Sequence, residues 1–109
     1  MPKRGDVYWV TLDPTIGTEI NKKRPCLIIS CNEGNEECSR VIVAAITSSV
    51  KTVRPFEVKT LIKNQEGKVL LNQIRTIDKQ RLHEKIATLD KQTMLHIEKA
   101  LKISLALTV

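Results

Sequence analysis

Short apolar segments separated by polar connectors make up most of the chain. The clearest is Val41–Ile46, an uninterrupted apolar run rich in β-branched residues, which is typical of a buried strand. The other segments are short, contain β-branched or aromatic residues, and end near turn-forming residues. We therefore expect strands at residues 6–12, 25–30, 41–47, 56–60, 68–77 and 85–89.

Two long polar connectors interrupt this pattern. Residues 13–24 open with Asp13-Pro14 and contain Gly17, which are both turn signals, so we expect a loop there. Residues 31–40 are polar and carry several glutamates, and we expect a second connector. Neither stretch is apolar enough to supply a core element.

The final apolar segment has the spacing of a helix rather than a strand. One face carries four apolar side chains at about 100° per residue: Met94, Ile97, Leu101 and Leu105. Asp90 is placed to cap its N-terminus, and His96 falls on nearly the opposite face. Short strands followed by one C-terminal helix predict a mainly β, α+β fold, in which the helix packs against a small curled antiparallel sheet or barrel.

Length and charge narrow the function. The 109 residues suit one domain, 1–109, and no linker or repeat divides them. The net charge of +6 favours a polyanionic partner such as nucleic acid. Tyr8, Trp9 and Phe56 are the only aromatic residues, too few for a platform on which successive bases stack.

The cysteines and histidines predict neither disulfides nor metal ligands. The chain has three cysteines, an odd number, without the close pairs of zinc sites, and both histidines lie far downstream. We interpret the thiols as reduced and mostly structural, which favours a cytoplasmic protein. The N-terminus lacks the apolar stretch of a signal peptide, and the longest apolar run is too short to span a membrane. We expect no metal and no cofactor.

Candidate reactive residues border the apolar segments. Arg24 precedes the strand at 25–30, and Thr47 and Ser48 follow the strand at 41–46. Strand ends commonly carry functional side chains, although solvation for Arg24 and turn formation for the other two explain the same positions. Cys26 could act as a nucleophile, but its place inside a strand favours burial. The four glycines are scattered singly, so no phosphate-binding loop is predicted.

Longer motifs resemble one protein family over nearly the whole chain. They are Gly5-Asp6-Val7-Tyr8-Trp9, Leu12-Asp13-Pro14, Gly17-Thr18-Glu19, Arg24-Pro25-Cys26-Leu27-Ile28-Ile29, residues 41–48, residues 70–82 and residues 100–107. Their content and order resemble the MazF/PemK toxins, and residues 70–82 resemble the MazF branch in particular.

The resemblance implies a fold, an activity and partners. Members of this family are sequence-specific endoribonucleases, the toxins of type II toxin–antitoxin pairs. Their fold is a small SH3-like β-barrel of the CcdB/PemK type with a C-terminal helix. They form homodimers that bind single-stranded RNA, including mRNA, along a groove at the dimer interface. An antitoxin with an acidic, flexible segment covers that groove.

The resemblance also assigns roles to individual residues. Arg24 and Thr47 match the catalytic pair of the MazF branch. Residues matching RNA-contacting positions are Glu19, Ser48, Asn72 and Gln73. The PemK branch has an Arg and an Asp on the late strand where this chain has Leu70 and Asn72, so the acid–base assignment of that branch does not transfer.

The implied reaction needs no metal. The 2′-OH of the RNA attacks the adjacent phosphorus and gives a 2′,3′-cyclic phosphate and a 5′-OH. Arg24 is suited to bind the phosphate and its developing charge, and Thr47 to hydrogen-bond beside it. The proton acceptor stays open. A guanidinium gives up its proton at high cost, whereas Glu19 is chemically easier but lies in a loop.

Two hypotheses without catalysis compete with the endoribonuclease hypothesis. The CcdB proteins, on the same scaffold, poison gyrase by protein–protein contact, but they carry a C-terminal Trp, whereas the only Trp here is Trp9. A non-catalytic RNA-binding module is the other. If the chain does cleave RNA, the loops at 17–23 and 49–54 are the expected determinants of which sequence it recognises.

Overall fold

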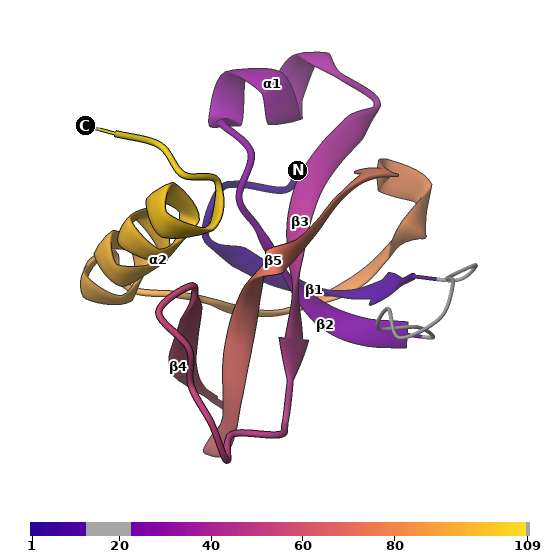
Figure 1. Ribbon diagram of the computed structural model, residues 1–109. Helices are drawn as coiled ribbons and strands as arrows, with labels where there is room; N and C mark the ends of the chain where they lie inside the picture. The colour runs from indigo at the N-terminus through magenta and orange to yellow at the C-terminus, as the bar shows by residue number, and fades with distance from the viewer. Residues whose placement is uncertain (13–22, 109) are drawn as a thin grey trace.

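One curled sheet forms most of the molecule (Figure 1). The computed structural model describes residues 1–12 and 23–108. Within these ranges, six strands pair in the order β4-β5-β3-β2-β1-β6, every neighbouring pair antiparallel. Their bounds are β1 Asp6–Thr11, β2 Lys23–Ile28, β3 Arg40–Thr47, β4 Glu57–Ile62, β5 Gln65–Asp78 and β6 Leu82–Thr88. The predicted curled antiparallel sheet is thereby confirmed.

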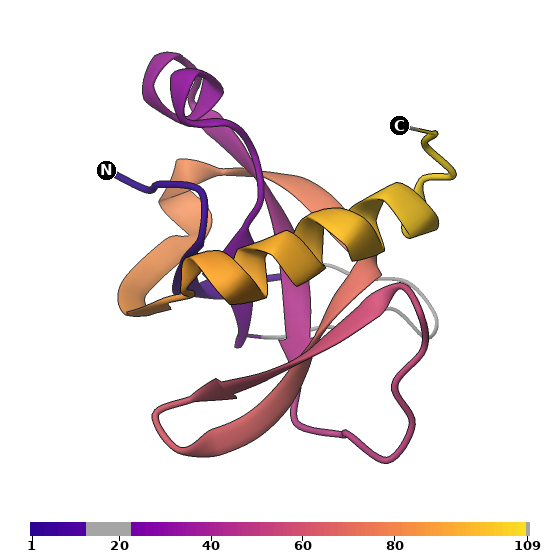
Figure 2. The ribbon, with the colours of Figure 1, turned by 90° about the vertical axis from the view of Figure 1, so that its left-hand side faces the viewer.

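Helix α2 (Lys91–Ser104) packs against β4 and β5, and Figure 2 shows it lying across the sheet. The predicted cap is present, because Asp90 Oδ1 accepts a hydrogen bond of 2.7 Å from the backbone N–H of Thr93. No helix in residues 1–12 and 23–108 is long and apolar enough to cross a membrane. His96 is exposed, as its position on the predicted helix indicated.

The predicted apolar stripe of α2 is correct for three of its four members. Ile97 is buried, and Met94 and Leu101 pack around the same core cluster. Leu105 lies just beyond the helix and is 49% exposed, while Ala100 is the further buried residue. The helix ends one residue before Leu105. The helical spacing was therefore continued past the end of the helix, and it predicted a core contact for Leu105 that is not made.

Two hydrophobic clusters explain the apolar run of β3 except for Ile42, which is 37% exposed and belongs to neither cluster. Ala44 and Ile46 belong to the cluster beneath α2, whereas Val41, Val43 and Ala45 belong to a second cluster. Successive side chains of a strand point to opposite faces, so a strand packed on both faces is apolar throughout. Cys26 of β2 lies in the second cluster and is fully buried, as expected.

The polar pattern predicted a connector without regular structure at residues 31–40, but this connector is more than a loop. It contains a short helix, α1 (Asn32–Glu37), which precedes β3. The side chain of Asn35 is fully buried; its Nδ2 donates to the Ser30 carbonyl at 3.1 Å, and its Oδ1 accepts from the Ser30 hydroxyl. These polar contacts, rather than an apolar face, hold α1 in place, so hydrophobic periodicity gave no sign of it.

Three strands extend further than their apolar residues indicated. β2 begins at Lys23, so Arg24 lies within the strand rather than closing a loop. β5 begins at Gln65 and β6 at Leu82, both on polar stretches that pair with neighbouring strands. Backbone pairing sets strand length, and it does not depend on the side chains being apolar.

β5 bends in its middle. Ala44 of β3 pairs with Ile74, but Ile46 pairs with Val69, so residues 70–73 of β5 stand where β3 has only Ala45. The first part of β5 pairs with β4 as well as β3, and the last part with β3. The bend separates the β4–β5 hairpin from the rest of the sheet, and in Figures 1 and 2 this hairpin lies at the end opposite α1.

Candidate active site

Arg24 and Thr47 meet at the adjacent ends of β2 and β3. The two strands are antiparallel, and Cys26 of β2 pairs with Ala45 of β3. Arg24 is two residues before Cys26 and Thr47 is two residues after Ala45, so continuing the register places them at the same level. Both side chains are half-buried. The antiparallel pairing of two distant segments therefore brings together the two residues that the sequence had singled out.

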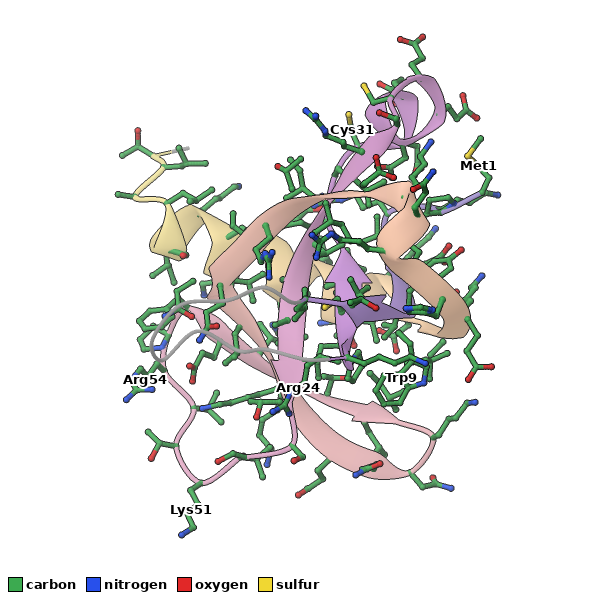
Figure 3. All side chains as sticks on the ribbon, turned by 90° about the vertical axis from the view of Figure 1, so that its right-hand side faces the viewer. Met1, Trp9, Arg24, Cys31, Lys51 and Arg54 are labelled. Carbon is green, nitrogen blue, oxygen red and sulfur yellow. The ribbon has the colours of Figure 1, made fainter. Side chains whose placement is uncertain are left out.

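The two residues line one cavity of about 540 Å³. The described residues around it come from β1, β2, β3, β6 and the β4–β5 hairpin: Trp9, Lys23, Arg24, Pro25, Ile46, Thr47, Ser48, Ile62, Lys63, Gln65, Glu66, Gly67 and Ile86. Figure 3 shows Trp9 and Arg24 near the base of the central strands, above the β4–β5 hairpin. Ser48, the third residue predicted from the strand ends, lines the same cavity.

The cavity has a cationic rim and an apolar wall. Lys23, Arg24 and Lys63 supply positive charge, and Glu66 is the carboxylate among the described lining residues. Lys63 and Asn64 form the hairpin tip with φ of 50° and 65°, the left-handed pair that a tight two-residue turn requires. Sequence analysis missed Lys63 and Glu66, because neither is near Arg24 or Thr47 along the chain. An excess of positive charge in a concave site suits a phosphate-bearing ligand.

Thr47 is held closely by its neighbours. Its Oγ1 accepts a hydrogen bond from the backbone N–H of Ser49 at 3.3 Å, which leaves the hydroxyl proton available to a ligand. Gly67 of β5 lies against its backbone, because a Cβ built on Gly67 would lie 3.0 Å from the Thr47 carbonyl oxygen and 3.2 Å from Ile46 Cγ2. This close approach explains why the position carries glycine.

The other predicted residues are placed elsewhere or lie outside the described ranges. Asn72 is exposed and Gln73 half-buried on the bent part of β5, and neither lines the cavity. Glu19, with most of the 17–23 loop, lies outside the described residues. The cavity therefore unites Arg24, Thr47 and Ser48 but not the whole predicted set.

The cysteines do not form a reactive group in this site. Burial raises the pKa of the Cys26 thiol to about 12, although the charges of Arg75 and Arg24 oppose this shift. Cys31 and Cys38 are exposed at the two ends of α1, so the expectation of mostly structural thiols fits Cys26 alone. Among the described residues, no three His, Cys, Asp or Glu side chains gather as metal ligands would.

Comparisons of the sequence and of the fold with known proteins both find similarity to endoribonuclease toxins. Residues 3–105 match the family of PemK-like, MazF-like toxins of type II toxin–antitoxin systems. The chain is similar to the endoribonuclease EndoA of Bacillus subtilis (strain 168), with 44% identity over 96% of this chain and 95% of that protein. It is 40% identical to the endoribonuclease MazF of Staphylococcus epidermidis, over 98% of this chain and 93% of that protein.

A solved structure agrees over the full length. An endoribonuclease from a mycobacterial species, determined in complex with its cognate antitoxin, superposes with a TM-score of 0.84 and 27% identity. The match covers 100% of this chain and 99% of that one. The similarity includes the cavity-forming strands as well as α2.

Proposed function

The chain belongs to the PemK-like, MazF-like family and is the endoribonuclease toxin of a type II toxin–antitoxin system. We propose that it cleaves RNA in the cavity lined by Arg24 and Thr47. The observation that carries this assignment is the meeting of these two residues at the ends of β2 and β3. A guanidinium and a hydroxyl in one cationic cavity are the groups expected around a phosphodiester that reacts without a protein nucleophile.

Arg24 binds the scissile phosphate in this proposal. Its planar guanidinium can donate two parallel hydrogen bonds to the non-bridging oxygens, and the strength of these bonds increases as negative charge develops on them. Lys23 and Lys63 on the same rim attract the RNA backbone. The rest of the cavity is largely apolar, which reduces screening of these charges by water.

The RNA supplies its own nucleophile. The 2′-oxygen forms a bond to phosphorus and gives up its proton, the bond from phosphorus to the 5′-oxygen breaks, and that oxygen takes up a proton. The products are a 2′,3′-cyclic phosphate and a 5′-OH end. Thr47 donates its hydroxyl proton in a hydrogen bond to the phosphate, with its orientation fixed by Ser49. Because the nucleophile is internal, the reaction needs positioning and charge stabilisation, and no metal-bound water.

The remaining roles are assigned from the sequence, and the proton acceptor stays open. Glu19 is the candidate acceptor from the sequence. Ser48 contacts RNA within the cavity, while Asn72 and Gln73 contact it from the bent part of β5. In this proposal, a single RNA strand runs from β3 toward β5.

The protein acts as a homodimer and is inhibited by an antitoxin with an acidic, flexible segment. Apolar side chains are exposed at the end of α2 and beyond it, where Ile103 is 47%, Leu105 49% and Leu107 57% exposed, and a second copy can cover them. The net charge of +6 favours both RNA and an acidic peptide, so the two ligands compete. Three free cysteines fit a cytoplasmic location.

One experiment tests the chemistry directly. The protein is incubated in EDTA with a single-stranded RNA, and with the same RNA carrying a single 2′-deoxy substitution at the mapped cleavage position. We expect cleavage of the first and an intact second strand, with a cyclic phosphate at the new end. Cleavage of the deoxy-substituted RNA would contradict attack by the 2′-OH. An intact all-RNA strand would instead favour a binding module or a gyrase poison.

A further inference from the structure

A buried ion pair lies beside the candidate active site and has no part in the proposed reaction. Lys68 Nζ of β5 lies 2.8 Å from Glu57 Oε1 of β4. The two side chains are only 8% and 3% exposed. Removing two charges from water is costly, and apolar replacements for such a pair are often as stable. The pair therefore calls for an explanation other than stability.

Both members of the pair also bind the loop that joins β3 to β4, residues 48–56. Lys68 Nζ donates a hydrogen bond to the carbonyl of Thr52, in the middle of this loop. Glu57 Oε1 accepts a hydrogen bond of 2.9 Å from the backbone N–H of Arg54, and its Oε2 lies 3.6 Å from the Arg54 guanidinium. The backbone N–H of Glu57 donates in turn to the Arg54 carbonyl at 2.9 Å.

The same pair is adjacent to Thr47. Lys68 is the direct partner of Thr47 in the pairing of β3 with β5, and Gly67 beside it is the residue that lies against the Thr47 carbonyl. The β3–β4 loop begins at Ser48, which lines the cavity. One short segment of β5 therefore contacts both the catalytic end of β3 and the loop that follows it.

The loop itself carries charges suited to RNA. Lys51 and Arg54 are exposed, and Figure 3 shows both along the loop, with Lys51 at its tip, pointing away from the molecule. A loop without regular structure has many conformations, and ordering it at the moment of binding weakens affinity. The hydrogen bonds at Thr52 and Arg54 already order the loop in the free protein, so the entropic cost of ordering it is not paid when RNA binds.

We propose that Glu57 and Lys68 are positioning residues, which hold the β3–β4 loop in a fixed conformation as an RNA-binding arm of the active site. This inference rests on the proposed function, because it takes the cavity at Arg24 and Thr47 as the place of cleavage. The pair acts on how tightly and at which sequence RNA is held, and it leaves the bond-breaking step to Arg24 and Thr47.

The test replaces both charges at once. Glu57→Met together with Lys68→Met leaves no unpaired buried charge and keeps the net charge at +6, so general attraction to RNA does not change. We expect KM to rise about tenfold, with kcat within about threefold of the parent, since the lost interactions serve binding. We also expect a changed choice of cleavage sites when the RNA ends are sequenced.

Two further measurements do not depend on catalysis. Trypsin should cut the double variant faster than the parent after Lys51, because the loop is no longer anchored. The Kd for an uncleavable 2′-deoxy-substituted RNA should rise by the same factor as KM. The matched control is Lys91→Met with Glu98→Met, the same substitutions at exposed positions of α2, and it should behave as the parent in all four assays: cleavage kinetics, sequencing of RNA ends, trypsin cutting and RNA binding.

The outcomes separate the two ideas. A folded double variant with parental KM, Kd and cleavage sites would overturn the positioning role, and so would unchanged trypsin cutting at Lys51. A parent protein that leaves all RNA whole would overturn the proposed function instead, and the Kd comparison would still decide whether the pair prepares the loop for RNA.

Discussion

Arg24 on β2 and Thr47 on β3 stand at the same level of two antiparallel strands, each two residues beyond the Cys26–Ala45 pair. Both line the cavity of about 540 Å³ at that end of the sheet. Because the two backbones are held by the sheet rather than by a loop, the guanidinium and the hydroxyl are presented with little freedom of position. This relationship underlies the first three predictions.

Arg24→Ala should abolish most RNA cleavage while leaving the fold intact. The change removes the proposed bidentate phosphate contact, and loss of such a charge-stabilising donor costs on the order of 10³-fold in kcat. Arg24→Lys should recover only part of the rate, since an ammonium is a point charge without the planar fork. The measurement is initial cleavage rate at saturating RNA. Arg40→Ala, at the far end of β3, is the control and should cleave like the parent.

Thr47→Ala should lower kcat about 10²-fold, because the variant lacks the hydroxyl that we propose to stabilise the phosphate. Thr47→Ser keeps the hydroxyl and should stay within about tenfold of the parent, since a serine rotates more freely than a β-branched residue. Thermal unfolding should show similar Tm values for both variants. Equal rates for the Ala and Ser variants would remove Thr47 from the mechanism.

Gly67→Ala should reduce both stability and activity. The added methyl would lie 3.0 Å from the Thr47 carbonyl oxygen, so the backbone of β3 or β5 must shift at a cost of about 1–3 kcal/mol. That shift moves Thr47, and kcat should fall with it. Urea unfolding and cleavage rates measure the two effects.

Gly34→Ala is the matched control for this change. Its new methyl would meet only the side-chain sulfur of Cys31, at 3.3 Å, which can rotate away. Alanine is also the better helix former, by about 1 kcal/mol, so this variant should be as stable as the parent or slightly more so. A destabilised Gly34 variant with a normal Gly67 variant would contradict the argument from close approach.

Acid should weaken the fold through Glu57. Burial by itself would raise the pKa of Glu57, but hydrogen bonds from Lys68 and the Arg54 backbone, with the charges of both residues, hold it below its ordinary value of 4.5. The folded state therefore binds this proton less readily than the unfolded state, so the stabilisation is complete above pH 4.5 and is lost as the pH falls through the lower folded value.

The comparison is made by urea unfolding at neutral pH and in steps below pH 4.5. The parent should lose more free energy of unfolding over this range than Glu57→Met/Lys68→Met, which lacks the group. Parallel losses in the two proteins would show that other carboxylates account for the acid sensitivity.

The three thiols should react at two very different rates. Cys31 and Cys38 are exposed, whereas Cys26 is buried with its pKa raised to about 12, so it holds almost no thiolate at neutral pH. A thiol-specific reagent should modify the first two rapidly and Cys26 only on unfolding. Cys31→Ser/Cys38→Ser should show no fast phase, and a fast phase in that variant would place Cys26 at the surface.

The sequence was most informative where side-chain chemistry acts locally. The apolar run Val41–Ile46 predicted the central strand, and Asp90 predicted the start of α2. It was least informative where polar groups satisfy one another in three dimensions. The buried Asn35 that holds α1, and the buried Glu57–Lys68 pair, both look like ordinary surface residues in a list of hydrophobic and polar positions.

For the site, the sequence identified the candidate reactive residues, and the fold determined which other residues line the same cavity. Arg24, Thr47 and Ser48 could be chosen from their places at strand ends and from the resemblance to a toxin family. Lys63 and Glu66 could not, because they reach the cavity through a hairpin distant in sequence. The bend of β5 similarly placed Asn72 and Gln73 outside the cavity, and nothing in their local sequence marks it.

The sequence by itself determined the fold class, the family and the candidate reactive residues, since these follow from periodicity, charge and motif. Tertiary structure alone decided which of those residues share a cavity and which buried charges anchor the loop beside it. The physical reason is that strand register and close backbone approach, such as that of Gly67 to Thr47, depend on pairing between segments far apart in the chain. Local preference specifies each strand, and only the assembled sheet specifies its neighbours.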